Sequence, residues 1–146
     1  MVRVDYLVLA EAAAAVEGRH YIHGAGWDAL LTPSFPATHP MMSVAVRLRV
    51  PWTDTNQPHG LELDVVDADE QSILREPVRG SVNVGRPPYL APGSDQVVCL
   101  ALNLVGMQFE RPGTYVVKLR VEGAEEVRSP FNVLPLPGAP PSGTPS

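Results

Sequence analysis

One stretch near the middle of the chain decides the fold class: residues 43–50 read SVAVRLRV. Its valines and leucine take every second position, with small or basic residues between them. Because successive side chains of a β-strand point to opposite faces, this alternation predicts a strand that buries one face and leaves the other in water.

Other segments extend this pattern along the chain. Apolar residues take every second position of 61–65, and again of 115–121 directly after a Pro-Gly turn. Residues 97–104 are apolar on both faces, which predicts a strand in the interior of a sheet. Weaker strands, expected at sheet edges, are 2–9, 19–27, 72–78, 81–85 and 127–133. Together these segments predict an all-β antiparallel sandwich of about seven to eight strands.

The charges on two of the safest strands suggest how they pair. Arg49 opposite Glu62 and Arg47 opposite Asp64 would give cross-strand pairs of opposite charge, each worth about 0.2–1 kcal/mol. The same register keeps the apolar faces of both strands on one side. We therefore expect these two strands to be neighbours in one sheet.

The alanine run at 12–15 leaves the conformation of residues 10–17 open. Alanine favours helix, but an isolated helix of this length is marginal in water. Glu17 and Gly18 before Arg19 are typical of a hairpin turn that leads into a strand. Strand–turn–strand is therefore the preferred prediction, and a short helix is the alternative.

Prolines and glycines mark the connections and the end of the chain. The longest predicted loops are 28–42, 51–59 and 86–96, of which the first and last are rich in proline. Residues 135–146 are almost wholly Pro, Gly, Ala, Ser and Thr, a composition that buries too little apolar surface to fold. We expect one sandwich domain over residues 1–134 and a disordered tail over 135–146.

Charge and cysteine content exclude several classes of function. The net charge of −5 argues against nucleic acid and anionic membranes as partners, because both require clustered Lys and Arg. Cys99 is the only cysteine, so no intrachain disulfide forms, and its apolar neighbours predict a buried, unreactive thiol. The sequence lacks a signal peptide and an apolar run of membrane-spanning length, which together predict a cytoplasmic protein.

Five short motifs carry a resemblance to a known family. They are GAGW at 24–27, VPWT at 50–53, VGRPP at 84–88, PGTY at 112–115 and PFNV at 130–133. As a set they resemble a family of small bacterial proteins of unknown function, over about residues 4–133. The resemblance implies a β-sandwich of immunoglobulin-like type and no assigned activity, so no functional residue is carried over from it.

The best candidate for cation binding is an acidic cluster of Asp64, Asp67, Asp69 and Glu70. Carboxylates at a hairpin tip can converge on calcium, but a polar turn in which the Asp side chains bond their own backbone is the preferred interpretation. No Ser, Thr or Cys is identified beside a general base, as nucleophilic catalysis would require. We therefore predict no enzyme, no catalytic residue, no bound metal and no cofactor, and leave cation binding by this cluster open.

A binding surface is the more credible functional feature, with Trp52, Arg86, Tyr89 and Leu90 as its candidate residues. An exposed tryptophan is a common interface anchor, although Trp52 could instead cap the core. The loop that carries the other three residues is stiffened by proline, which reduces the entropy lost on binding.

These features predict a non-catalytic protein-binding or scaffold domain that presents loops or a free sheet edge to a protein partner or to its own copy. The alternative is a small-molecule or carbohydrate-binding module with aromatic contacts from Trp27, Trp52 and Tyr89. Trp27 is otherwise expected in the core.

Overall fold

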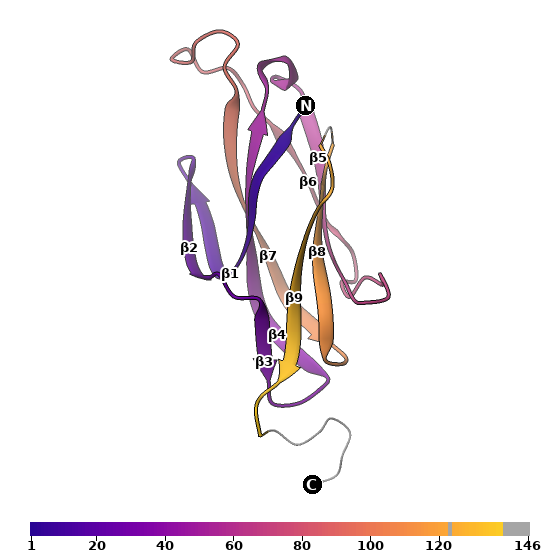
Figure 1. Ribbon diagram of the computed structural model, residues 1–146. Helices are drawn as coiled ribbons and strands as arrows, with labels where there is room; N and C mark the ends of the chain where they lie inside the picture. Colours follow the sequence, from indigo (N-terminus) through magenta and orange to yellow (C-terminus); the bar gives the residue numbers. More distant parts are fainter. Residues whose placement is uncertain (123, 139–146) are drawn as a thin grey trace.

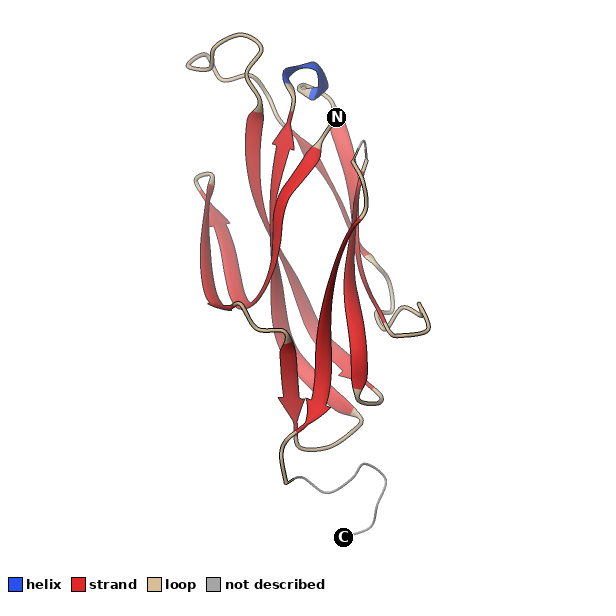
Figure 2. Cartoon of the chain, in the orientation of Figure 1, coloured by secondary structure: helices blue, strands red, loops and turns tan. Residues whose placement is uncertain are grey.

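The computed structural model describes residues 1–122 and 124–138. Most of the predicted tail, residues 139–146, lies outside the described residues. The described part is all-β, with nine strands and one 3-10 turn (Figures 1 and 2). The strands are β1 (Arg3–Val16), β2 (Arg19–Ala25), β3 (Ala29–Thr32), β4 (Ala37–Val50), β5 (Pro58–Val66), β6 (Val78–Asn83), β7 (Gln96–Phe109), β8 (Gly113–Val121) and β9 (Val127–Pro135), and the turn is η1 (Trp52–Asp54).

The strands form two sheets whose apolar faces meet in one core. Sheet A has the order β2-β1-β4-β7, and sheet B has the order β3-β9-β8-β5-β6. Neighbouring strands are antiparallel except β3, which runs parallel to β9. The predicted all-β class is therefore confirmed.

The alternating positions that predicted the strands do face the core. Val46 and Leu48 on β4 meet Leu63 on β5 and Leu119 on β8, and all four side chains are buried. At one end of the core the rings of Phe109 and Phe131 pack edge to face. This apolar alternation is thus a sound guide to which face of each strand is buried.

The predicted pairing of 43–50 with 61–65 is wrong, because β4 lies in sheet A and β5 in sheet B. The 3-10 turn η1 carries the chain from one sheet to the other. The predicted pairs Arg49–Glu62 and Arg47–Asp64 therefore do not form. Both arginines instead reach Asp5 on β1, with N–O distances of 3.4 Å from Arg47 and 3.1 Å from Arg49.

The predicted places of several strands in their sheets also need correction. β7 was expected in the interior and lies at the edge of sheet A, whereas β1 and β9 were expected at edges and lie inside their sheets. Residues 72–78 do not form a strand: Ser72 makes an isolated bridge to Val66, and β6 begins only at Val78. The expected loop 28–42 contains β3 and the start of β4, because β3 finds a partner in β9.

Residues 10–17 form strand–turn–strand, as preferred from the sequence. Glu17 and Gly18 have φ values of 51° and 73°, the two positive values that a two-residue hairpin turn requires. β1 leaves β4 after Ala10 and pairs with β2 instead. The resulting hairpin arm, residues 11–25, turns back along the outer face of sheet A (Figure 1).

Candidate functional site

The structure brings two of the four predicted binding residues into direct contact. The Arg86 guanidinium lies 4.2 Å from the centre of the Trp52 ring. Its Nη2 donates to the Trp52 carbonyl at 2.8 Å, and its Nε donates to Thr55 Oγ1 at 2.6 Å. Trp52 is half-buried beneath this cation and is not among the described residues that pack against the core. Arg86 therefore holds the η1 turn in place.

The other two predicted residues lie further along the same loop. The backbone N–H of Leu90 donates to the Pro87 carbonyl at 3.1 Å, which closes a turn. This turn presents Tyr89 to solvent with 84% of its surface exposed, whereas Leu90 is half-buried. Tyr89 and Arg86 are thus the exposed members of the predicted surface, and Trp52 and Leu90 are half-buried.

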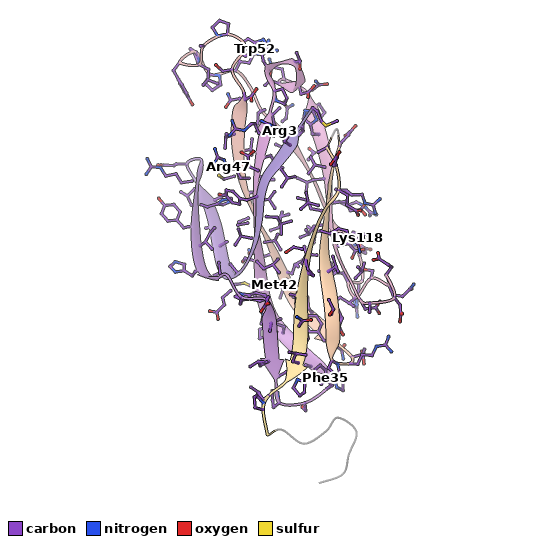
Figure 3. All side chains as sticks on the ribbon, viewed as in Figure 1. Arg3, Phe35, Met42, Arg47, Trp52 and Lys118 are labelled. Carbon is purple, nitrogen blue, oxygen red and sulfur yellow. The ribbon has the colours of Figure 1, made fainter. Side chains whose placement is uncertain are left out.

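The two tryptophans lie at opposite ends of the molecule. Trp27 packs at 6.2 Å from the Phe131 ring, and Phe131 in turn contacts Phe109, the last residue of β7. Trp52 lies two residues after Val50, the last residue of β4, which pairs with the first residue of β7. Figure 3 shows Trp52 at the end that holds the amino terminus. A strand as long as β7 spans about 40 Å, so Trp27 and Trp52 cannot line one pocket.

The edge of β7 is the longest unpaired strand edge in the described part of the chain. One side of β7 pairs with β4 from Gln96 to Phe109, and sheet A ends on its other side. All fourteen residues of β7 are uncharged, and none is proline. Backbone N–H and C=O groups of an unpaired edge are a template for another strand, and charges or prolines normally block it.

A groove runs beside the C-terminal half of this edge. Residues 103–108 of β7 form one wall, and residues 73–76 together with Val78, the first residue of β6, form the other. The groove has a volume of about 720 Å³ and contains one basic and one acidic side chain, Arg75 and Glu76. It therefore has room for an extended segment and carries no net charge.

Within the groove, β7 exchanges its buried and exposed faces at Gly106. Val105 before it is 74% exposed, whereas Met107 after it is 2% exposed. Gly106 has a φ of 65°, a left-handed conformation that glycine adopts without steric cost. Pro40 lies opposite in β4, between two paired positions, and has no N–H to continue the ladder. The flat part of the β7 edge therefore ends at Val105.

The arm is held on sheet A by His20, a role that the sequence did not indicate. The Tyr6 hydroxyl lies 2.6 Å from His20 Nδ1, and His20 Nε2 lies 2.8 Å from the Leu100 carbonyl oxygen on β7. Burial raises the pKa of the Tyr6 phenol. Cys99 lies in the same outer-face row, opposite Arg47, and is half-buried, so its predicted place in the core is wrong.

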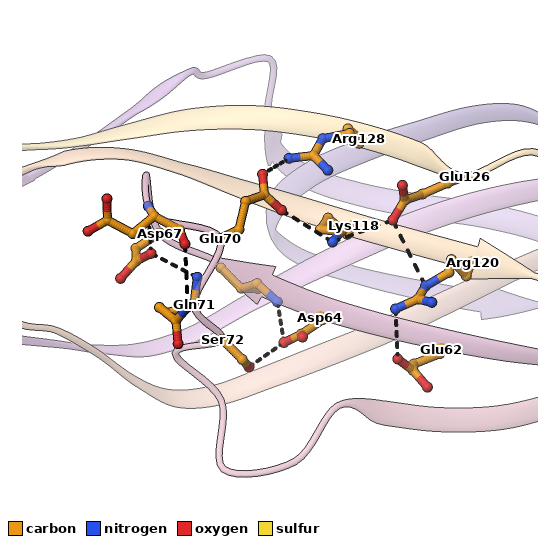
Figure 4. A network of polar contacts seen from close by, with 12 residues as sticks. Glu62, Asp64, Asp67, Glu70, Gln71, Ser72, Lys118, Arg120, Glu126 and Arg128 are labelled. Atoms are coloured by element: carbon orange, nitrogen blue, oxygen red, sulfur yellow. Dashed lines mark hydrogen bonds and ion pairs between the residues drawn. The ribbon is translucent and has the colours of Figure 1, made fainter.

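The acidic cluster forms the polar turn preferred from the sequence. Asp67 Oδ1 accepts hydrogen bonds from the backbone N–H groups of Asp69 and Gln71, at 2.9 and 3.0 Å. Asp64 Oδ1 accepts a hydrogen bond from Ser72 Oγ at 2.6 Å (Figure 4). Within residues 1–122 and 124–138, no three or more His, Cys, Asp or Glu side chains are grouped so that they could hold a metal ion.

Glu70, the last residue of that cluster, joins an ion-pair network on the outer face of sheet B. It contacts Arg128 on β9 and Lys118 on β8, and Lys118 also lies 3.6 Å from Glu126 (Figure 4). The hydrogen bond from Arg128, reinforced by Lys118, lowers the pKa of the Glu70 carboxyl. This network is exposed and contains both signs of charge, which is typical of a solvated sheet face.

Comparison with known proteins addresses the identity of the chain, and the length of its helices addresses whether one could cross a membrane. A search of curated proteins finds no match. In the described residues, no helix has the length and apolar character needed to cross a bilayer. The model of family DUF6941, described as a family of unknown function, matches residues 5–134, almost the span over which the five motifs predicted a resemblance. The chain belongs to this family of unknown function.

Proposed function

We propose that this protein is a non-catalytic binding domain that takes up an extended strand of a protein partner along the edge of β7. The observation that carries the proposal is the composition of that edge: fourteen residues without a charge or a proline, beside an open groove. A peptide that adds to a sheet edge gains main-chain hydrogen bonds, and pockets for alternate side chains select among sequences.

The other sheet edges are poor acceptors by comparison. β6 has six residues and includes Arg79 and Gly80, and β3 has only four. β2 has seven residues but forms the outer strand of the arm and begins with Arg19. Short strands and charged residues are the usual means by which proteins prevent association at an edge. These features leave β7 as the preferred acceptor.

We also propose that the fold is of immunoglobulin-like type. In that fold, strands A, B and E share one sheet and strands C, F and G share the other. The orders β1-β4-β7 and β9-β8-β5 correspond to A-B-E and G-F-C. The Tyr115 hydroxyl near the start of β8 donates to the Arg111 carbonyl at 2.6 Å, like the tyrosine corner of strand F. The open edge of β7 is then where strand D would pair.

The partner class follows from charge. With a net charge of −5, the domain would be repelled by a phosphate backbone. We therefore propose a protein partner. We also propose that the domain is cytoplasmic and acts without a cofactor.

Photo-crosslinking tests the function at the edge itself. A benzophenone amino acid is placed at position 105, and at position 31 as the matched control, because Val105 and Leu31 are both exposed apolar strand residues, 74% and 52% exposed. We expect cells to yield a defined crosslinked protein from position 105 and not from position 31. The crosslink should disappear when Asn103→Lys adds a charge to the edge. Equal crosslinking from both positions, or none from position 105, would contradict the proposal.

A further inference from the structure

We propose that the strand accepted by β7 is β7 of a second copy of this chain, paired antiparallel about a two-fold axis at Asn103. This inference rests on the proposed function and names its partner. β7 is itself an extended, uncharged strand, so it has the chemistry that its own edge requires. Pairing one edge with its copy gives a closed, isologous dimer.

Two features of the structure limit the stretch that can pair. Toward the start of β7, His20 from the arm already contacts the Leu100 carbonyl oxygen at 2.8 Å. Toward its end, Gly106 with φ 65° exchanges the faces of the strand. Residues 101–105 remain between these limits, and their centre is Asn103.

This register also fits the side chains. A two-fold axis at Asn103 places Val105 opposite Ala101 of the partner subunit, so the most exposed large apolar side chain of β7 meets a small one. Residues directly opposite one another in an antiparallel pair have Cα atoms 4.5–5.5 Å apart, close enough for their side chains to touch. Asn103 Oδ1 accepts a hydrogen bond from Ser43 Oγ at 2.6 Å, and the proposed pairing gives its amide N–H groups an acceptor in the partner's Asn103.

Charge permits this contact despite the net charge of −5. Like charges brought together at an interface oppose association, but β7 carries none. The groove beside it contributes Arg75 and Glu76, whose charges cancel. Five residues from each chain form a short pairing, so we expect a dimer that dissociates on dilution.

Disulfide trapping tests the register. In a Cys99→Ser background, Asn103→Cys should form a covalent dimer on mild oxidation, because its Cα distance to its own copy falls in the range of disulfides. Val105→Cys alone should not, because the two copies of residue 105 lie four residues apart along the strands, about 13 Å. A mixture of Ala101→Cys and Val105→Cys chains should crosslink while leaving Asn103 intact. Ser81→Cys on the β6 edge is the matched control.

Light scattering of the unmodified protein supplies the second measurement. The mass should rise from monomer to dimer with concentration, and Asn103→Lys or Val105→Lys should remain monomeric with an unchanged circular dichroism spectrum. A monomer at every concentration, or trapping no faster at position 103 than at position 81, would overturn the dimer. If position 105 then still crosslinks a different protein in cells, the proposed function stands without the dimer. If it crosslinks nothing, both fail.

Discussion

The outer faces of the two sheets are built in opposite ways. Sheet B exposes a network of ion pairs to water, with Lys118 reaching Glu70 in the loop after β5 and Arg120 reaching Glu62 on β5. Sheet A carries small and neutral residues over much of its outer face, and Ala45 and Ser43 are completely buried there. The arm covers this part of the face, whereas Arg47 and Arg49 further along β4 pair with Asp5. The outward-facing residues of an alternating strand can therefore lie in water, as in sheet B, or beneath another segment of the chain, as in sheet A.

The outer faces of the two sheets differ in how much their contacts contribute to the free energy of unfolding. Exposed ion pairs contribute little to the free energy of unfolding, because solvent and salt screen them. Beneath the arm, by contrast, a polar group left without a partner costs about 1–3 kcal/mol. Substitutions on sheet A should therefore be costly and those on sheet B tolerated.

The largest effect is expected where a charge is forced beneath the arm. Ala45→Glu places an unpaired carboxylate at a completely buried position, which should lower the free energy of unfolding by about 3–5 kcal/mol. Ser81→Glu, on the outer face of sheet B, should change it by about 0.5 kcal/mol at most. Urea unfolding followed by circular dichroism measures both, and equal effects would break the contrast between the faces.

Loss of the histidine that holds the arm should have the next largest effect. His20→Ala leaves the Tyr6 hydroxyl and the Leu100 carbonyl without this partner, at an expected cost of about 1–3 kcal/mol. Hydrogen exchange should accelerate over residues 11–25 and stay unchanged in sheet B. His23→Ala, an exposed position on the same strand, is the control and should leave exchange in the arm as it was.

Tyr6→Phe sharpens the same comparison by removing a single hydroxyl. The expected loss is about 1 kcal/mol, the usual value for one hydrogen bond. The double variant with His20→Ala should lose less free energy of unfolding than the sum of the two single losses, because both substitutions remove the Tyr6–His20 contact. Full additivity in a double-mutant cycle would show that this contact does not hold the arm.

The smallest effect is expected in the network of sheet B. Arg128 and Lys118 lower the pKa of Glu70 in the folded state. The stabilisation of the folded state by the ionised Glu70 carboxylate is therefore fully present above the pKa that Glu70 has in the unfolded chain. It is lost as the pH falls through the folded pKa. The difference in melting temperature between the protein and Glu70→Gln should be small at pH 7. It should shrink toward zero in acid and in high salt, and a difference that persists in both would contradict the account.

Some of the candidate site was visible in the sequence, and some was not. The lack of charge over residues 96–109 could be read directly, yet it led to an interior strand and not to an open edge. The contact of Arg86 with Trp52 joins residues from separate loops, and only the course of the chain between the sheets brings them together. The role of His20 in holding the arm could not be read from the sequence, because its partners lie fourteen and eighty residues away.

The sequence by itself determined which face of β4, β5 and β8 is buried and where the first hairpin turns. Both are local properties: side chains alternate every two residues, and Glu17-Gly18 suits the positive φ values of a tight turn. Only the tertiary structure decided which strands are neighbours, so that β4 and β5 separated and β7 became an edge. Alternation assigns a strand its buried face but not its partner, and that choice depends on contacts far apart in the chain.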